Sequence, residues 1–138
     1  MSLKDSSDEG ICILSFDSGG PGTYSQLLIL KNYMDQMAIF QDMKNEDLYP
    51  ADYFDLMGGV GFGGLAAFML GYLRMSVDEA IDALFVIAFT IFDESTQKGT
   101  PEVNMRNLKS VIETLLRAKQ IALETRMQDK GNQSRCKV

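Results

Sequence analysis

Five of the seven residues from position 58 to position 64 are glycine, and this cluster joins two apolar segments. Residues 53–57 before it are mostly aromatic or aliphatic, which is typical of a short buried β-strand. Residues 65–73 after it are apolar and carry no charge. A chain that passes from strand to helix through so many glycines makes a sharp turn with close backbone contacts. The cluster therefore predicts a strand over residues 53–57, a tight turn and a helix over residues 62–75.

Within the cluster, residues 59–63 have the spacing of a nucleophile elbow, G-x-S-x-G. In that motif a strand-to-helix turn lifts a serine clear of the backbone. The glycine positions of the motif are Gly59 and Gly63, and the serine position is Gly61. Glycine has no side chain that could attack a carbonyl group, so the motif predicts a hydrolase scaffold without its nucleophile. A glycine turn needed only for tight strand–helix packing would give the same pattern.

Residues 11–30 form a second unit of this kind and read I-C-I-L-S-F-D-S-G-G-P-G-T-Y-S-Q-L-L-I-L. They predict an interior parallel strand over residues 11–16, a glycine-rich loop over 17–23 and a helix over 24–40. The two units together resemble patatin-like phospholipases, fungal members above all, whose corresponding blocks read D-G-G-G-x-R-G and Y-F-D-L-I-G-G-T-S-T-G-G. The resemblance runs from about residue 11 to residue 84 and continues more weakly to the C-terminus.

Patatin-like enzymes hydrolyse lipid acyl esters with a serine–aspartate pair. The resemblance implies that their oxyanion loop, whose backbone N–H groups stabilise the developing negative charge, corresponds to Asp17, Ser18, Gly19, Gly20 and Gly22. Ser18 stands where the family motif has glycine, and Gly22 where it has arginine. Pro21 removes one further backbone donor. An ordinary strand-to-helix turn fits this loop equally well.

The family's catalytic aspartate lies in a later D-G-G or D-G-A motif, and this chain contains no Asp-Gly dipeptide. Residues 136–138 resemble the start of the family's next strand. The resemblance therefore implies a catalytically degenerate patatin-like protein or fragment that binds acyl chains or a protein partner. A sheet that stops there is expected to keep an uncovered edge and to self-associate. An active acylhydrolase would need an unrecognised nucleophile or a completing partner chain.

A different class of protein also fits the glycine cluster, because residues 59–64 satisfy G-x-G-x-x-G between a strand and a helix. That pattern seats a dinucleotide pyrophosphate on a helix N-terminus and is followed, about twenty residues on, by an acid at the end of a strand. Asp78, Glu79 and Asp82 lie near that distance but are expected on a helix. A nucleotide-binding module is therefore the alternative interpretation.

Composition restricts the other functional classes. Nineteen acidic and thirteen basic residues give a net charge of −6, which disfavours nucleic acid and anionic lipid as partners. The chain has no histidine, which excludes a Ser-His-Asp or Cys-His mechanism within one subunit. It also has no cysteines paired at ligand spacing, so we expect no metal and no cofactor.

The cysteines and serines outside the motifs are expected to be structural. Two cysteines do not form a disulfide framework, which favours a reduced cytoplasmic setting. We expect Cys12 in the core, and Cys136 reactive if the C-terminal segment is mobile. Ser15 is expected on a buried strand and Ser25 on a helix.

One uncharged stretch, residues 56–73, is eighteen residues long and thus admits a membrane-spanning helix by length alone. Six of its residues are glycine, five of them within positions 58–64, which would break such a helix in its first half. A buried strand, turn and helix is the favoured interpretation, with no transmembrane span.

Two further helices follow. Ser76 and Glu79 have the spacing of a capping box, which predicts a helix over residues 77–92. Thr100 and Pro101 provide an N-cap and a first-turn proline for a fourth helix. That helix is expected to turn four apolar side chains inward: Leu108, Val111, Ile112 and Leu115.

The order strand, helix, strand, helix indicates an α/β fold with a parallel sheet. We expect residues 1–10 to form a polar, flexible N-terminal tail, not a signal peptide. Residues 11–138 are expected to form a partial patatin-like α/β domain. Its architecture would be a layered sandwich with a short parallel sheet flanked by helices, resembling the N-terminal half of the family's domain.

Overall fold

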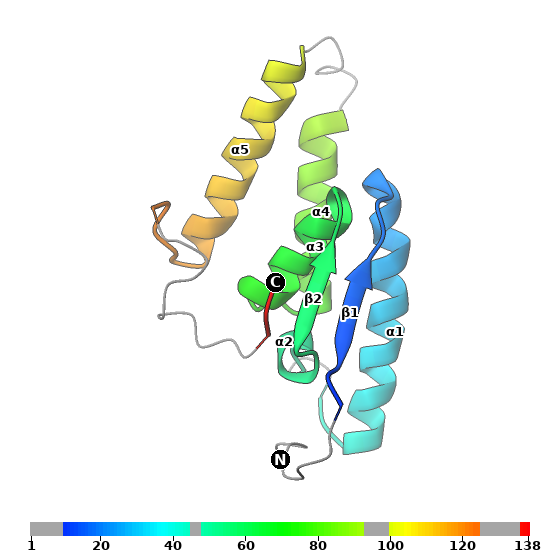
Figure 1. The fold of residues 1–138 in the computed structure, drawn as a ribbon. Helices are drawn as coiled ribbons and strands as arrows, with labels where there is room; N and C mark the ends of the chain where they lie inside the picture. The colour runs from blue at the N-terminus through cyan, green and yellow to red at the C-terminus, as the bar shows by residue number, and fades with distance from the viewer. Residues whose placement is uncertain (1–9, 45–47, 93–99, 125–135) are drawn as a thin grey trace.

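The computed structural model describes residues 10–44, 48–92, 100–124 and 136–138, which form a mixed α/β fold rich in helix. Two short parallel strands lie side by side, with the helices beside and behind them in Figure 1. The predicted α/β class and helix-flanked parallel sheet are confirmed. In chain order the elements are β1 (Ile13–Phe16), η1 (Gly20–Gly22), α1 (Thr23–Gln41), α2 (Pro50–Tyr53), β2 (Leu56–Gly59), α3 (Phe62–Ala67), η3 (Phe68–Tyr72), α4 (Val77–Phe92) and α5 (Pro101–Ala118).

The central strand of the described sheet is β2. On one side it pairs in parallel with β1. On its other side Lys137 forms a parallel bridge with Leu56. The Lys137 N–H donates to the Asp55 carbonyl at 2.8 Å, and the Lys137 carbonyl accepts from the Met57 N–H at 2.8 Å. The expectation that residues 136–138 begin the next strand agrees with this bridge.

Both strands begin later than the sequence predicted. β1 starts at Ile13 rather than residue 11, and β2 starts at Leu56 rather than residue 53. Tyr53 instead ends α2, because Pro50 occupies the first turn, where its fixed φ angle and missing N–H favour a helix. The Tyr53 hydroxyl then donates to Oε1 of Gln41 in α1 at 2.7 Å.

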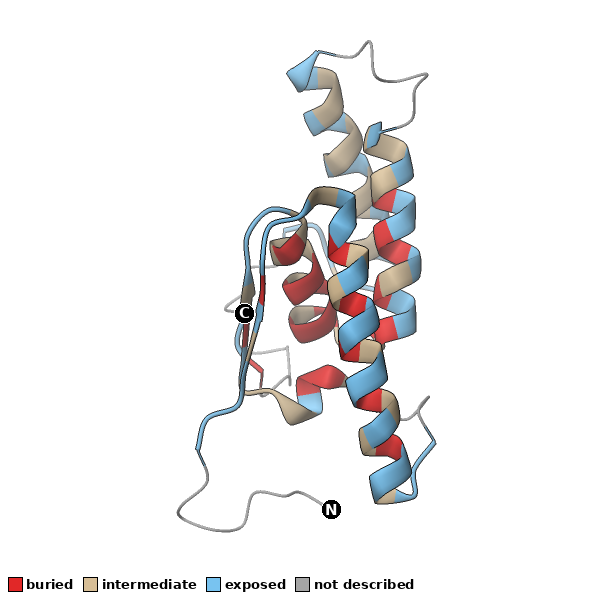
Figure 2. Ribbon diagram, turned by 90° about the vertical axis from the view of Figure 1, so that its right-hand side faces the viewer, coloured by how far each residue is buried: buried red, intermediate tan, exposed pale blue. Residues whose placement is uncertain are grey.

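The described helices cover one face of the sheet and leave the other open. Figure 2 shows both strands at the left and these helices to the right of the strands. Ile13 and Leu56, which are neighbours on the open face, are 60% and 40% exposed. Within the described residues β1 pairs with β2 alone. Among the described residues β1 is therefore an edge strand and not the predicted interior strand, because an apolar run does not reveal which elements flank it.

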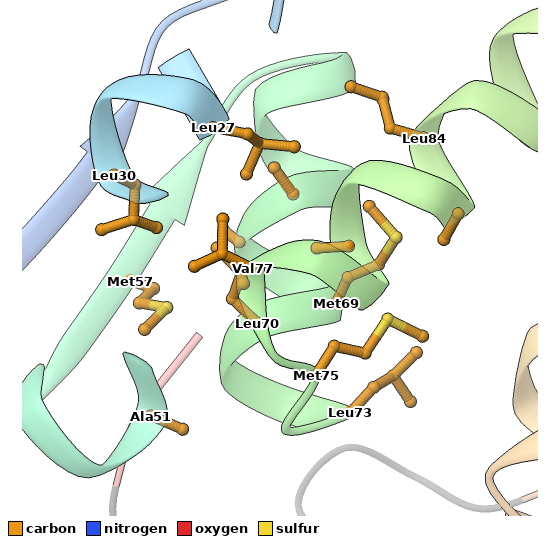
Figure 3. Packing of buried hydrophobic residues seen from close by; sticks show 14 of the residues in the cluster. Leu27, Leu30, Ala51, Met57, Met69, Leu70, Leu73, Met75, Val77 and Leu84 are labelled. Atoms are coloured by element: carbon orange, nitrogen blue, oxygen red, sulfur yellow. The ribbon is translucent and has the colours of Figure 1, made fainter. Parts of the chain in front are cut away.

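The core lies between the covered face of the sheet and helices α1, α3 and α4 (Figure 3). Leu27, Leu30 and Met34 of α1 are buried, and Met37 is half-buried. Met57 of β2 lies in the same cluster and is fully buried. Burying one side chain of this size stabilises the fold by about 1.5–3 kcal/mol.

The helix predicted over residues 62–75 is divided into two parts. After α3 the chain widens into the π-helix η3, where the Leu73 N–H donates to the Phe68 carbonyl at 3.1 Å. The widened turn contains Gly71, where an added Cβ atom would stand 2.5 Å from Cγ2 of Val138. Contact with the C-terminal residues therefore requires glycine here, and regular helix ends before Met75.

The predicted capping box of α4 is confirmed. The Glu79 N–H donates to Oγ of Ser76 at 3.1 Å, and the Ser76 N–H donates to Oε2 of Glu79 at 2.8 Å. The other carboxylate oxygen of Glu79 lies 3.3 Å from Nζ of Lys119, just beyond the end of α5. The cap thus links the start of α4 to the end of α5.

The most peripheral helix is α5. It begins at Pro101, as predicted, and packs against α4, but none of its residues is fully buried. Four side chains that were expected to face inward are half-buried: Leu108, Val111, Ile112 and Leu115.

Among the described residues, no helix combines the length and the apolar character needed to cross a membrane. Residues 56–73 fold as β2, the glycine turn, α3, η3 and the residue after η3. The favoured interpretation of the uncharged stretch is therefore confirmed.

Candidate functional site

The turn between β2 and α3 has the backbone conformation of a sharp elbow. Gly61 lies at its apex with φ +59° and ψ −127°, a combination that side-chain-bearing residues rarely adopt. Its carbonyl accepts the Leu65 N–H at 3.1 Å, so the turn passes directly into α3. The Gly63 N–H donates to the Val60 carbonyl at 3.0 Å. The strand–turn–helix predicted from the glycine cluster is thus present, with Gly61 in a conformation that would strain a residue with a side chain.

The glycines on either side of the apex are required by close packing. A Cβ atom added to Gly59 would stand 2.4 Å from the carbonyl carbon of Gly63. A Cβ atom added to Gly63 would stand 2.6 Å from the Asp17 carbonyl oxygen. Gly58, one residue earlier, has nothing within 4 Å of such an atom. Glycine is therefore needed at the three motif positions for different reasons. Gly61 needs it for its φ angle, and Gly59 and Gly63 have no room for a side chain.

The loop after β1 lies against this turn. Its first residue, Asp17, is held by Gln26 of α1, whose side-chain amide accepts the Asp17 N–H and donates to the Asp17 carbonyl, both at 2.9 Å. The Ser18 N–H donates to the Asp17 carboxylate at 2.8 Å. The Gly22 N–H donates to the Gly19 carbonyl at 2.9 Å and closes η1.

The resemblance assigned this loop to the binding of an oxyanion. The bonds above leave fewer of its backbone N–H groups free to bind one. The N–H groups of Asp17, Ser18 and Gly22 already have acceptors within the loop or α1. Pro21 has no backbone N–H group to donate. Gly19 and Gly20 are left as the donors nearest to the start of α1, with Gly20 at a positive φ of 52°.

The loop and the elbow meet at Ser18 and Gly61. A Cβ atom on Gly61 would stand 3.3 Å from the Ser18 hydroxyl oxygen. The resemblance placed Ser18 in the oxyanion-like loop, as a departure from a glycine, and nothing in the pattern indicated that its hydroxyl lies beside Gly61. The structure therefore brings the two predicted motifs together and places a hydroxyl group beside the position where a nucleophile side chain would begin.

Among the described residues, no activating base accompanies that hydroxyl. The chain contains no histidine. In the described residues no carboxylate or amine hydrogen-bonds to the Ser18 side chain, and the Asp17 carboxylate accepts the Ser18 N–H instead. The same residues contain no group of three or more His, Cys, Asp or Glu that could hold a metal ion. The site thus has a sharp turn, two backbone donors and a hydroxyl, without an arrangement for proton transfer.

An aromatic surface borders the two motifs. We define it as five side chains from α1, α3 and α4: Tyr24, Phe62, Phe85, Phe89 and Phe92. Tyr24 follows the loop and its ring centroid lies 5.0 Å from that of Phe85. Phe62 follows Gly61, and its ring centroid lies 5.8 Å from that of Phe92. Phe89, between these two pairs along α4, is 72% exposed. An apolar ligand could therefore contact this surface beside the elbow.

Three residues outside the motifs lie elsewhere than expected. Cys12 is exposed rather than in the core, because it precedes the edge strand β1. Cys136 was expected to be reactive if the C-terminal segment is mobile; it is buried instead, and burial raises the pKa of its thiol. Ser15 is exposed because odd-numbered residues of β1 face the open side of the sheet. Ser25 is exposed on α1.

The acids that the nucleotide interpretation would need lie in the first two turns of α4, not at the end of a strand. Asp78 pairs with Lys31 of α1 at 3.0 Å. The Glu79 carboxylate accepts the Ser76 N–H in the helix cap. Both carboxylates therefore have structural partners.

No protein-family model, curated protein or solved structure matches this chain. Its function is therefore inferred from its own residues.

Proposed function

We propose that this chain is a catalytically degenerate patatin-like protein that binds apolar ligands without cleaving them. The observation that carries the proposal is Gly61, a residue without a side chain at the apex of a turn with the conformation of a nucleophile elbow. The turn retains the two flanking glycines that its close packing requires. A scaffold of this geometry can present a ligand to the loop donors, but it has no group to attack an ester.

The aromatic surface supports acyl chains as the ligand. Binding of an apolar chain to exposed phenylalanines on one face of a helix is favourable, because it removes apolar surface from water. The net charge of −6 disfavours anionic lipids, so we propose an uncharged or zwitterionic amphiphile. The two cysteines, both free, suit the reduced cytoplasmic setting that we propose with it.

A second candidate is an active acylhydrolase that uses Ser18 as its nucleophile. The contact between the Ser18 hydroxyl and the Cβ position of Gly61 favours it. A serine needs a base to attack an ester at neutral pH. Because the described residues supply none to Ser18, this candidate requires a partner chain that contributes the base.

Labelling and binding experiments separate the two candidates. The degenerate protein is expected to leave p-nitrophenyl butyrate unhydrolysed and to remain unlabelled by a fluorophosphonate probe, because no activated serine is present. Stoichiometric labelling that disappears in Ser18→Ala would establish the second candidate instead.

Binding is measured with 1-pyrenedecanol, an uncharged fluorescent alcohol. We expect saturable binding that falls about tenfold or more in Phe85→Ser/Phe89→Ser, because two aromatic contacts are lost. Phe40→Ser is the matched control, since Phe40 is 87% exposed but lies near the end of α1, outside the aromatic surface. Equal loss in both variants, or no saturable binding at all, would contradict the proposal.

Self-association through the uncovered sheet is part of the same proposal. In the described residues, no element covers the open face of the sheet, and no strand pairs with β1 on the side away from β2. Exposed strands of this kind favour pairing between chains.

A further inference from the structure

The edge of β1 that faces away from β2 offers a regular row of backbone groups. Cys12 turns its carbonyl toward β2, where it accepts the Asp55 N–H at 2.8 Å. Because backbone groups alternate along a strand, Ile13 and Ser15 turn theirs toward the opposite edge. Within the described residues β1 pairs with β2 alone, so no strand lies against these two residues.

Two residues after Ser15, at Asp17, the side chain of Gln26 already pairs with this edge. Its side-chain amide both accepts from the N–H and donates to the carbonyl of Asp17. A neighbouring strand would use the same two groups in the same way. Gln26 therefore limits the available edge at Asp17 and leaves Ile13 and Ser15 as its next members.

A groove of about 500 Å³ runs beside this edge, between β1 and α1. Its helix side is apolar, with Ile29 72% exposed and Tyr33 48% exposed. Phe54, whose ring centroid lies 6.3 Å from that of Tyr33, also lines it. Figure 1 shows α1 lying beyond β1 on the side away from β2. The groove thus lies beside the position where the next strand of the sheet would pair with β1.

These features together fit an extended polypeptide. Its backbone would pair with Ile13 and Ser15, and every second side chain would enter the groove against Ile29 and Tyr33. Strand addition of this kind derives its affinity from main-chain hydrogen bonds and its selectivity from the pocket for alternate side chains.

The chain's own undescribed segments do not have a suitable sequence. Residues 1–9, 45–47, 93–99 and 125–135 contain only three large apolar side chains, Met1, Leu3 and Met127. None of these segments shows the apolar–polar alternation of a half-buried strand.

A second copy paired through its own β1 is also a poor fit. Two paired strands lie about 4.8 Å apart. Symmetric pairing would place both α1 helices over this narrow strip, whereas packed helices need about 8–10 Å between their axes. The groove therefore has room for one strand without a helix of its own.

We propose that the groove between β1 and α1 binds an extended segment of another polypeptide, which adds to the sheet beside β1 with an apolar side chain against Ile29. This site is distinct from the glycine elbow and does not depend on the proposed function. The residues lining the groove carry no charge, so a basic segment is favoured only through long-range attraction to the net charge of −6.

The probe is a synthetic octapeptide of alternating threonine and valine with a lysine at each end, added to the isotope-labelled full chain. Amide hydrogen exchange by NMR should slow about tenfold at Ile13 and Ser15. Leu14, whose N–H faces β2, should not change. Methylating the alternate peptide nitrogens on one edge should abolish the protection, and methylating those on the other edge should preserve it.

Two variants of α1 provide the matched comparison. Ile29→Asp places a charge in the groove and should weaken peptide binding about tenfold or more. Ile39→Asp, at a position 80% exposed and outside the groove, should not. Equal effects of the two substitutions, or unchanged exchange at millimolar peptide, would overturn the proposal. Protection of Ile13 and Ser15 that rises with protein concentration without peptide would overturn it too, because a second copy would then occupy the edge.

Discussion

The hydroxyl oxygen of Ser18 lies 3.3 Å from the point where a Cβ atom on Gly61 would stand. The two residues belong to separate strand-to-helix turns, which β1 and β2 bring together by pairing in parallel. Gly61 has no side chain, and its φ of +59° would strain any residue that had one. The hydroxyl beside it belongs to the neighbouring loop. The chemistry and the stability of this site therefore depend on the same small contact.

Gly61→Ser is expected to leave the chain without multiple turnover. A serine here has no base to remove its proton, and p-nitrophenyl butyrate should remain intact. The substitution should also lower the free energy of unfolding by about 1–3 kcal/mol, because a non-glycine residue at φ +59° is strained. The new side chain must in addition displace the Ser18 hydroxyl. Urea denaturation and an esterase assay measure the two effects.

Gly22→Ser is the control for that substitution. Gly22 has φ −64° and nothing within 4 Å of an added Cβ atom, so its stability should change little. Multiple turnover by the Gly61→Ser chain would show that a base exists within reach of residue 61 and would refute the account of a degenerate site.

Gly59→Ala and Gly58→Ala form a second matched pair, at adjacent positions in β2. The Cβ atom of the first would overlap the Gly63 carbonyl at 2.4 Å, and backbone cannot easily give way. We expect a loss of about 3 kcal/mol or more. The second meets nothing within 4 Å and should change stability by less than about 1 kcal/mol. Similar denaturation midpoints for the two variants would mean that the turn opens more readily than its packing indicates.

The sequence predicted those parts of the fold that depend on local chemistry. The capping box of Ser76 and Glu79 needs only four residues, and its two hydrogen bonds are present. The start of α5 at Pro101 and the turn at Gly61 are equally local. In each case a residue type suits one backbone position: serine an N-cap, proline the first turn of a helix, and glycine a positive φ.

The features that the sequence missed depend on distant neighbours. Cys12 is exposed, and Ile13 is half exposed, because no described element covers the edge and open face of β1. Tyr53 joined a helical turn instead of a strand because Pro50 initiates α2. The π-helix η3 contains Gly71, whose close approach to Val138 leaves no room for a Cβ atom, and hydrophobic periodicity does not predict such a contact.

The cap of α4 should make stability depend on pH. Burial raises the pKa of Glu79, but the hydrogen bond from the Ser76 N–H and the charge of Lys119 outweigh it and hold that pKa below its usual value of 4.5. The folded carboxylate thus stabilises the protein above that pH, and its contribution disappears as the pH falls through the lowered pKa. Glu79→Gln should accordingly destabilise the chain at neutral pH and much less in acid. Thermal melts at several pH values test this.

Ser76→Ala isolates the other half of the cap. It should cost about 1 kcal/mol through loss of the bond to the Glu79 N–H. It leaves the Ser76 backbone donor in place, so most of the acid dependence should remain. A pH dependence that disappears in Ser76→Ala but persists in Glu79→Gln would assign the titration to another group.

The two cysteines should differ in reactivity. Burial raises the pKa of the Cys136 thiol and also blocks access to it, whereas Cys12 is exposed. Reaction with a thiol reagent at neutral pH should be about tenfold or more slower at Cys136. Cys12→Ser and Cys136→Ser resolve the two rates. Equal rates would mean that residues 136–138 leave β2 frequently.

Self-association should occur through the open face of the sheet. Ile13 and Leu56 are neighbours there, and no described helix covers them. Burying such a pair against another sheet removes apolar surface from water, while repulsion from the net charge of −6 is screened beyond about 8 Å at physiological salt. Light scattering over a concentration series should therefore show dimers or larger species. Ile13→Thr/Leu56→Thr should shift them toward monomer, and Ile39→Gln, exposed on α1, should not. A monodisperse wild-type monomer with a sharp thermal transition would contradict the prediction.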